Sequence, residues 1–289
     1  MKKTVLIVLL YFIGCLLIPC LVTLAIGDDK EEVKKVDKTQ GAAVIETETA
    51  EDYIIRTVAS YYEEGDGGEF LKALAIVVRT YDALGEYLDF TPTTLTYQEL
   101  KTKWGDYYSA NLEAVTAAVN ATEGIVMVLE SGELLPYFCK ISAGYTRGKD
   151  NSCLAMVNCS EDLNAPEYMT VVSYTHSEVV DKLQTGYPDI ALDGGIADSF
   201  QVVSRDEAGY VTEVMVGNLT ISGDELASVL ALNSANFMVT PGNENMVFTV
   251  KGIGNGYGMS LYTARQKALN GAGYKEILFY FYKNIALNE

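Results

Sequence analysis

Apolar side chains recur along this chain with two different periods, and each period predicts a different element. Between residues 66 and 81 they recur every three to four positions, which predicts a helix that opens at Asp66-Gly67-Gly68-Glu69. The same period predicts further helices. Three of them are Glu51–Tyr62, Ser260–Asn270 and Tyr274–Tyr282. A fourth has Leu112, Val115, Ala118 and Val119 on its inward face and Glu113 on its outward face, and a short fifth helix begins at Gly223.

Short runs rich in β-branched residues lie between these helices and predict strands. These runs are Gly124–Leu129, Glu133–Lys140, Phe200–Ser204, Val211–Val216 and Met246–Val250. Ser131-Gly132 and Ala208-Gly209 each lie between two such runs and predict hairpin turns. Helices and strands do not alternate regularly, so the pattern favours an α+β fold over a doubly wound sheet.

The N-terminus carries the longest apolar run. After Met1-Lys2-Lys3, the 24 residues from Thr4 to Gly27 contain no charge. As a helix of about 1.5 Å per residue they would extend about 36 Å, enough for a hydrocarbon core of roughly 30 Å. A cleaved signal peptide is the alternative, but its apolar region is usually only about 7–15 residues. We therefore expect an uncleaved anchor, with Lys2 and Lys3 in the cytoplasm and the rest outside the cell membrane.

Residues 28–50 follow with 7 acids, 4 lysines and no aromatic residue. Such a composition buries little surface and predicts a tether, although a short charged helix that continues the anchor is the alternative. The expected organisation is a stub at 1–3, an anchor at 4–27, a linker at 28–50 and a single mixed helix and strand domain with a substrate cleft at 51–289.

Charge and histidine content exclude several classes of protein. The net charge of −18 argues against nucleic acid as a partner. The single histidine, His176, excludes sites built on two or three histidines. Catalysis, if present, is expected to rest on carboxylates, hydroxyls, thiols or tyrosines.

Glu69 is the first candidate, with two interpretations. Asp66 and Glu69 have the spacing of a capping box, in which Glu69 would reach back to the amide of Asp66. Alternatively, Glu69 is partly desolvated beside Phe70, which would raise its pKa towards that of a general acid. Lys72 and Arg79 on the same helix would then hold substrate, or would simply be solvated.

Two loops are further candidates. The run Gly252-Ile-Gly254-Asn-Gly256-Tyr-Gly258-Met-Ser260 is either a tight strand-to-helix connection or the wall of a substrate cleft. It does not fit the dinucleotide fingerprint, because Tyr257 and Met259 occupy the places for the third glycine. Ser142-Ala-Gly144-Tyr-Thr146-Arg147 follows a predicted strand and is either a sugar site or an ordinary loop.

Three cysteines, Cys139, Cys153 and Cys159, lie in the expected domain. A location outside the cytoplasm permits a disulfide, for which Cys153 and Cys159 are the candidates. A structural zinc site with a fourth ligand from His176, an acid or water is the alternative, although the spacing matches no standard zinc ribbon. Free thiols are the third possibility.

Taken together, these segments resemble the SpoIID domain, the family of stage II sporulation protein D and the amidase enhancers. The resemblance extends from about Ala50 to the C-terminus. It rests on four stretches in the family's order: Glu51-Asp-Tyr-Ile54, Glu69-Phe-Leu-Lys-Ala-Leu-Ala-Ile-Val-Val-Arg79-Thr80-Tyr81, Tyr137-Phe-Cys139-Lys-Ile-Ser142-Ala-Gly144-Tyr-Thr146 and Gly254-Asn255-Gly256-Tyr257-Gly258-Met259-Ser260-Leu261.

The resemblance implies a peptidoglycan lytic transglycosylase in which Glu69 is the catalytic acid and base. No cofactor is required for that chemistry. The implied partners are peptidoglycan glycan strands, a peptidoglycan amidase and other engulfment proteins, at the membrane of a sporulating cell. The implied substrate-binding residues are Lys72, Arg79, Tyr81, Ser142, Gly144, Thr146, Asn255, Tyr257, Met259 and Ser260.

This chain departs from the family pattern at several positions. Asn255 and Cys139 replace histidines, Leu261 replaces a glutamine and Ala143 replaces a glycine. Cys139 preserves a possible zinc ligand, whereas Asn255 cannot carry a proton at neutral pH. The alternative function is therefore a non-catalytic glycan-binding module that recruits or stimulates an amidase.

Overall fold

The computed structural model describes residues 49–85, 88, 90–192 and 194–288. The expected stub at 1–3, the anchor at 4–27 and all but the last two residues of the expected linker lie outside this part. Within it, no helix is both long enough and apolar enough to cross a membrane. The mixed helix and strand content agrees with the α+β prediction.

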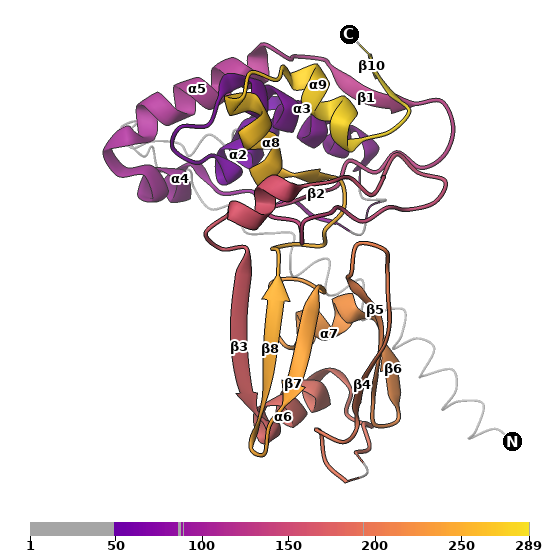
Figure 1. Ribbon diagram of the computed structural model, residues 1–289. Helices are drawn as coiled ribbons and strands as arrows, with labels where there is room; N and C mark the ends of the chain where they lie inside the picture. Colours follow the sequence, from indigo (N-terminus) through magenta and orange to yellow (C-terminus); the bar gives the residue numbers. More distant parts are fainter. Residues whose placement is uncertain (1–48, 86–87, 89, 193, 289) are drawn as a thin grey trace, which may run out of the picture. The chain divides into compact units, whose positions relative to one another are not determined.

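Helices from both ends of the described sequence form a helical lobe (Figure 1). It contains α2 (Ala50–Tyr61), α3 (Gly68–Leu84), α4 (Tyr97–Trp104), α5 (Tyr108–Asn120), α8 (Leu261–Leu269) and α9 (Tyr274–Phe281), with the short 3₁₀ turns η2 (Gly105–Tyr107) and η3 (Ser160–Asn164). The central helix is α3, in which every residue from Ala73 to Thr80 is buried. A helix that is apolar around most of its circumference must be enclosed by others.

Two short strand pairs tie the C-terminal segment into this lobe. Strand β1 (Val126–Leu129) pairs antiparallel with β10 (Ile285–Asn288), and β2 (Phe138–Cys139) pairs parallel with β9 (Met259–Ser260). The hairpin predicted at Ser131-Gly132 is therefore wrong. Its two flanking segments take partners from the C-terminal segment, which no local turn signal reveals.

The middle of the chain forms a β lobe with its own core (Figure 1). One antiparallel sheet has the order β3-β8-β7, from Met169–Thr175, Asn245–Lys251 and Phe237–Pro241. The other has the order β4-β5-β6, from Phe200–Arg205, Val211–Val216 and Leu219–Ile221. The predicted hairpin at Ala208-Gly209 is confirmed, because β4 and β5 pair antiparallel.

Apolar residues of both sheets and of two helices meet in this second core. Helices α6 (His176–Gly186) and α7 (Gly223–Val229) contribute Leu183 and Leu226, and Phe248 of β8 contacts Phe200 of β4 edge to face at 6.0 Å. The core of the helical lobe is a separate cluster around α3. The described residues thus contain two apolar cores within one compact unit.

The chain crosses between the lobes twice, at residues 165–168 and 252–258. These crossings lie side by side, because the N–H of Gly252 donates to the carbonyl of Tyr168 at 2.7 Å. The predicted glycine-rich run is therefore the return crossing, and we call residues 252–258 the glycine loop.

Candidate active site

Glu69 lies in the first turn of α3 and faces the start of α9. The N-cap of α3 is Gly67, without a side-chain cap, and one carboxylate oxygen of Glu69 accepts the N–H of Tyr274 at 2.9 Å. Tyr274 is the first residue of α9, whose N-cap Gly273 also lacks a side-chain cap. Glu69 therefore satisfies an amide that α9 leaves unpaired, and the positive ends of two helices stabilise its negative charge.

The capping-box interpretation is wrong, because Asp66 and Glu69 bind different partners. Asp66 Oδ2 accepts the N–H of Glu63 at 2.8 Å, and its Oδ1 accepts Nε of Arg265 at 2.7 Å. The spacing of the two residues is that of a capping box, but Asp66 instead binds Arg265 of α8 and Glu69 binds the N–H of Tyr274 of α9.

The expected rise in the pKa of Glu69 is also wrong. Its side chain remains 39% exposed, and Nζ of Lys72 binds its Oε1 at 2.7 Å. The hydrogen bond from Lys72, followed by the one from the Tyr274 amide, lowers the pKa of Glu69 below its usual value. In the unliganded protein Glu69 is thus a carboxylate that can accept a proton. A second acidic residue, just before α3, has its pKa shifted in the opposite direction.

That residue is Asp66, whose side chain is only 3% exposed. Burial raises the pKa of Asp66, although its ion pair with Arg265 opposes the shift. Two carboxyl groups three residues apart therefore have their pKa values displaced in opposite directions, which is a feature of acid–base sites. Sequence reasoning treated Asp66 only as a cap, because its partner Arg265 is 199 residues away.

The other predicted residues of α3 have different roles. Lys72 is the ion-pair partner of Glu69, and Tyr81 is half-buried against Phe90 with ring centres 6.1 Å apart. Arg79 is buried, and its guanidinium binds the Glu51 carboxylate and backbone carbonyls that include Thr122 at 2.7 Å. Arg79 therefore joins α2 to the end of α5, and the prediction that it binds substrate is not supported by its position.

The Ser142–Thr146 segment and Ser260 meet inside the protein rather than at its surface. Ser142, Thr146 and Ser260 are fully buried, and Gly144 is buried with φ of +103°. Asp162 of η3 is the centre of this cluster. It accepts the N–H of Ser142 at 2.7 Å and the hydroxyls of Ser260 and Thr263, each at 2.8 Å.

The cluster holds the start of α8 in place. Ser260 is the N-cap of α8, so its hydroxyl joins the helix terminus to Asp162. Burial raises the pKa of Asp162, while the surrounding hydroxyls oppose the shift. These residues organise the loop; the structure does not present their side chains to a ligand. No motif in the sequence pointed to Asp162, which lies outside all four of the stretches quoted above.

The neighbours of the glycine loop leave no room for side chains at two of its glycine positions. Gly252, Gly254, Gly256 and Gly258 all have positive φ. A Cβ on Gly258 would lie 1.7 Å from the carbonyl oxygen of Tyr137, and one on Gly256 would lie 2.4 Å from the ring of Tyr210. Glycines are required here for close packing, as the tight-connection interpretation predicts.

Asn255 and Tyr257 are the half-buried residues at the tip of this loop. Oδ1 of Asn255 accepts the N–H of Tyr257 at 2.9 Å, so the asparagine stabilises its own turn. Met259 and Leu261 are fully buried in the helical core. The predicted binding role of Met259 is therefore not supported.

The three cysteines are free and buried, so the disulfide predicted between Cys153 and Cys159 is wrong. Within the described residues, no group of three or more histidine, cysteine or acidic side chains is arranged to hold a metal, which also argues against zinc on Cys139, Cys153 and Cys159. Burial raises the pKa of all three thiols, that of Cys159 to about 12.

The structure also contains a cavity of about 390 Å³, and none of the predicted site residues lines it. It is lined by residues 148–150 and 154–156, by Lys283 and by the β4–β5 turn at Asp206–Ala208. Both lobes therefore contribute to its wall.

Comparison with known proteins adds an independent line of evidence. Residues 38–129 match the family model SpoIID, described as stage II sporulation protein. Stage II sporulation protein D of Bacillus subtilis strain 168 is 27% identical over 266 residues, covering 85% of this chain and 76% of the relative. The protein of the same name from Bacillus amyloliquefaciens is 26% identical with the same coverage.

A third relative is an uncharacterized protein of Brachyspira hyodysenteriae, 23% identical over 75% of this chain and 60% of its own length. The model match covers α2 to β1 of the helical lobe, whereas the two Bacillus relatives match most of the chain. The chain is thus similar to the SpoIID family of stage II sporulation proteins over residues 38–129, and to stage II sporulation protein D of two Bacillus species over most of its length.

Proposed function

We propose that this protein is a membrane-anchored lytic transglycosylase that cleaves peptidoglycan glycan strands during sporulation, with Glu69 as its acid and base. The observation that carries the proposal is the position of Glu69. It is a partly exposed carboxylate at the N-termini of two helices, in the stretch that resembles the family's catalytic glutamate.

The reaction needs a single carboxyl group. Glu69 in its acid form gives a proton to the glycosidic oxygen as the bond to C1 of N-acetylmuramic acid breaks. It then takes the proton of the C6 hydroxyl as that oxygen bonds to C1, which forms a 1,6-anhydro ring. Glu69 ends protonated as it began, and water is not consumed, because the nucleophile is already held on the same sugar.

Glycan binding would supply the acid form. A sugar that covers the exposed part of Glu69 removes water from the carboxylate, and desolvation raises a carboxyl pKa. A substrate hydroxyl that competes for Lys72 would remove the largest cause of the low pKa in the free protein. Asp66, with its raised pKa and its position in the preceding turn, supports an acid–base site at this end of α3.

The test uses the full-length protein and purified glycan strands, with and without stem peptides. Mass spectrometry should find 1,6-anhydro-N-acetylmuramic acid ends for the wild type, reduced about 10²–10⁴-fold for Glu69→Gln. Glu64→Gln is the matched control, since it removes the same charge from an exposed residue and should retain activity. New reducing ends in place of anhydro ends would contradict the mechanism and indicate a hydrolase with a second carboxylate.

A second function is favoured by a specific observation. In the free protein Glu69 is held as a carboxylate by Lys72, and Asn255 stands where the family pattern has a histidine. A glycan-binding module that stimulates a peptidoglycan amidase needs no proton donor. Under this alternative, Glu69→Gln would leave glycan binding and amidase stimulation unchanged, and the wild type would produce no anhydro ends.

A further inference from the structure

Arg147 is a buried cation that lies between the two lobes and has no part in the chemistry above. It follows the Ser142–Thr146 segment of the helical lobe and is only 4% exposed. A buried guanidinium is retained only where counter-charges and hydrogen bonds surround it. Its partners therefore show what it holds.

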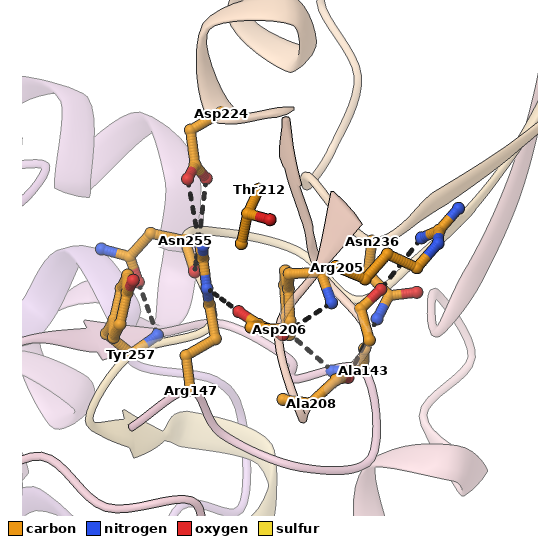
Figure 2. A network of polar contacts seen from close by, with 12 residues as sticks. Ala143, Arg147, Arg205, Asp206, Ala208, Thr212, Asp224, Asn236, Asn255 and Tyr257 are labelled. Atoms are coloured by element: carbon orange, nitrogen blue, oxygen red, sulfur yellow. Dashed lines mark hydrogen bonds and ion pairs between the residues drawn. The ribbon is translucent and has the colours of Figure 1, made fainter. Parts of the chain in front are cut away.

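Both carboxylates that neutralise Arg147 come from the β lobe (Figure 2). Nε donates to Asp206 Oδ2 at 2.7 Å, in the β4–β5 turn. Nη1 donates to the two oxygens of Asp224, in the first turn of α7, at 2.9 and 3.1 Å. One side chain of the helical lobe is thus fixed on two separate elements of the β lobe.

Arg147 also contacts the glycine loop (Figure 2). Nη1 also donates to the carbonyl of Asn255 at 3.2 Å, and the backbone N–H of Arg147 donates to the carbonyl of Gly256 at 2.8 Å. The guanidinium lies 4.5 Å from the ring centre of Tyr257. On the β lobe it lies 5.0 Å from the ring centre of Tyr210, within the range of a cation–π contact.

These contacts define the conformation of the loop tip. Four glycines with positive φ confer little rigidity of their own, because glycine readily populates both signs of φ. Asn255 is held by its carbonyl and Tyr257 by its ring, and the two residues are joined by the bond from the Tyr257 N–H to Asn255 Oδ1. A planar guanidinium can make these contacts together, whereas an ammonium cannot.

We propose that Arg147 is a positioning residue that fixes the glycine loop on the β lobe, so that Asn255 and Tyr257 form a preorganised surface for the glycan. The proposal rests on the proposed glycan substrate but not on Glu69 being catalytic. Its consequence is that Arg147 controls glycan affinity and leaves the chemical step unchanged.

The experiment compares full-length wild type, Arg147→Lys and Arg147→Met. Hydrogen exchange of residues 252–258 measures the loop, and titration with purified glycan strands measures affinity. Both variants should exchange faster in the loop, and their Kd for glycan should rise about tenfold, as expected for lost charged hydrogen bonds. Where turnover is measured, KM should rise by the same factor with kcat within about twofold.

Arg205→Met is the matched control. Arg205 donates to the carbonyls of Gly209 and Phe237, both in the β lobe, so this variant removes an arginine without touching the glycine loop. It should leave loop exchange and glycan affinity unchanged. Asp224→Asn provides a second test in case the Arg147 variants fold poorly, since it weakens the same bridge from the opposite side.

The outcomes separate this inference from the proposed function. Faster loop exchange and weaker glycan binding support it even if the wild type produces no anhydro ends, which would overturn only the enzyme. Unchanged loop exchange, or unchanged affinity, in both Arg147→Met and Asp224→Asn overturns it. A fall in kcat at unchanged KM also overturns it, because that result would place Arg147 in the chemical step.

Discussion

The helical lobe and the β lobe are each built around an apolar core, but they differ in what their polar groups do. In the helical lobe, Glu69 is partly exposed at the junction of α3 and α9. At the junction with the β lobe, Arg147 is buried and fully engaged by Asp206, Asp224 and the glycine loop. The first arrangement leaves a charged group accessible to a ligand, whereas the second fixes the relative position of two segments.

Under the proposed function, this difference separates the group that carries the reaction chemistry from the group that positions the glycine loop. A carboxylate that must gain and lose a proton remains near water, where its pKa responds to a ligand. A cation that only positions a loop is buried, because burial strengthens each of its contacts. The two lobes have separate apolar cores, so the independence of these cores is the first feature to test.

The largest expected effects on stability come from truncating each core. Phe248→Ala in the β lobe and Ile76→Ala in α3 both remove a fully buried side chain. Each should lower the free energy of unfolding by about 3–5 kcal/mol, measured by chemical denaturation. Hydrogen exchange should accelerate mainly in the lobe that carries the substitution. Equal acceleration in both lobes for both variants would show that the two cores unfold as one.

Asp162→Ala should be the next most damaging change. It leaves the buried N–H of Ser142 and the hydroxyls of Ser260 and Thr263 without their acceptor. The free energy of unfolding should fall by about 3 kcal/mol, and the start of α8 should lose protection from exchange. Asp162→Asn, which keeps one carbonyl oxygen, should cost less. An equal cost for both would contradict the role of the accepting oxygen.

The same residue predicts a pH dependence of stability. The folded-state pKa of Asp162 is raised above the ordinary value of 3.8 by burial. A raised pKa means that the folded state binds the proton more tightly than the unfolded state. The stability of the wild type relative to Asp162→Asn should therefore be greatest below that value and should decline as pH rises through the raised pKa. Denaturation curves across this range, with Glu161→Gln at the half-buried neighbouring position as the control, would test the sign.

Lys72→Met should shift the pH profile of activity. Because Lys72 is the largest cause of the low pKa of Glu69, its removal should raise that pKa. If the acid form of Glu69 starts the reaction, the limb of the kcat/KM profile that reports Glu69 moves to higher pH. Lys101→Met, at an exposed position of α4, is the control and should leave the profile unchanged. If the pH profile of Lys72→Met is the same as that of the wild type, the group whose titration controls activity is not Glu69.

The smallest effect is expected at the surface. Lys140 pairs with Glu167, but both side chains are more than two-fifths exposed. Water and salt screen such a pair, so Lys140→Ala should change the free energy of unfolding by about 0–1 kcal/mol. A larger loss in denaturation experiments would show that this link between the lobes matters as much as the buried one at Arg147.

The sequence by itself determined many of the local elements and the resemblance to a family. The apolar period predicted α2, α8 and α9 to within one residue and also located α3 and α5, because the buried face of a helix recurs every three to four positions. It also determined the β4–β5 hairpin and the glycine loop, whose residues are dictated by backbone conformation. The motifs containing Glu69 predicted the family that the comparisons support.

Only the tertiary structure decided what those residues contact. It paired β1 and β2 with the C-terminal strands, turned Glu69 towards α9 and placed Arg79 and Met259 inside the protein. It also showed the importance of Asp162 and Arg147, whose partners lie 98 and 77 residues away along the chain. A local sequence pattern predicts the backbone conformation and the buried face of a single segment. Burial, ion pairing and the sign of a pKa shift depend on segments that meet only when the chain is folded.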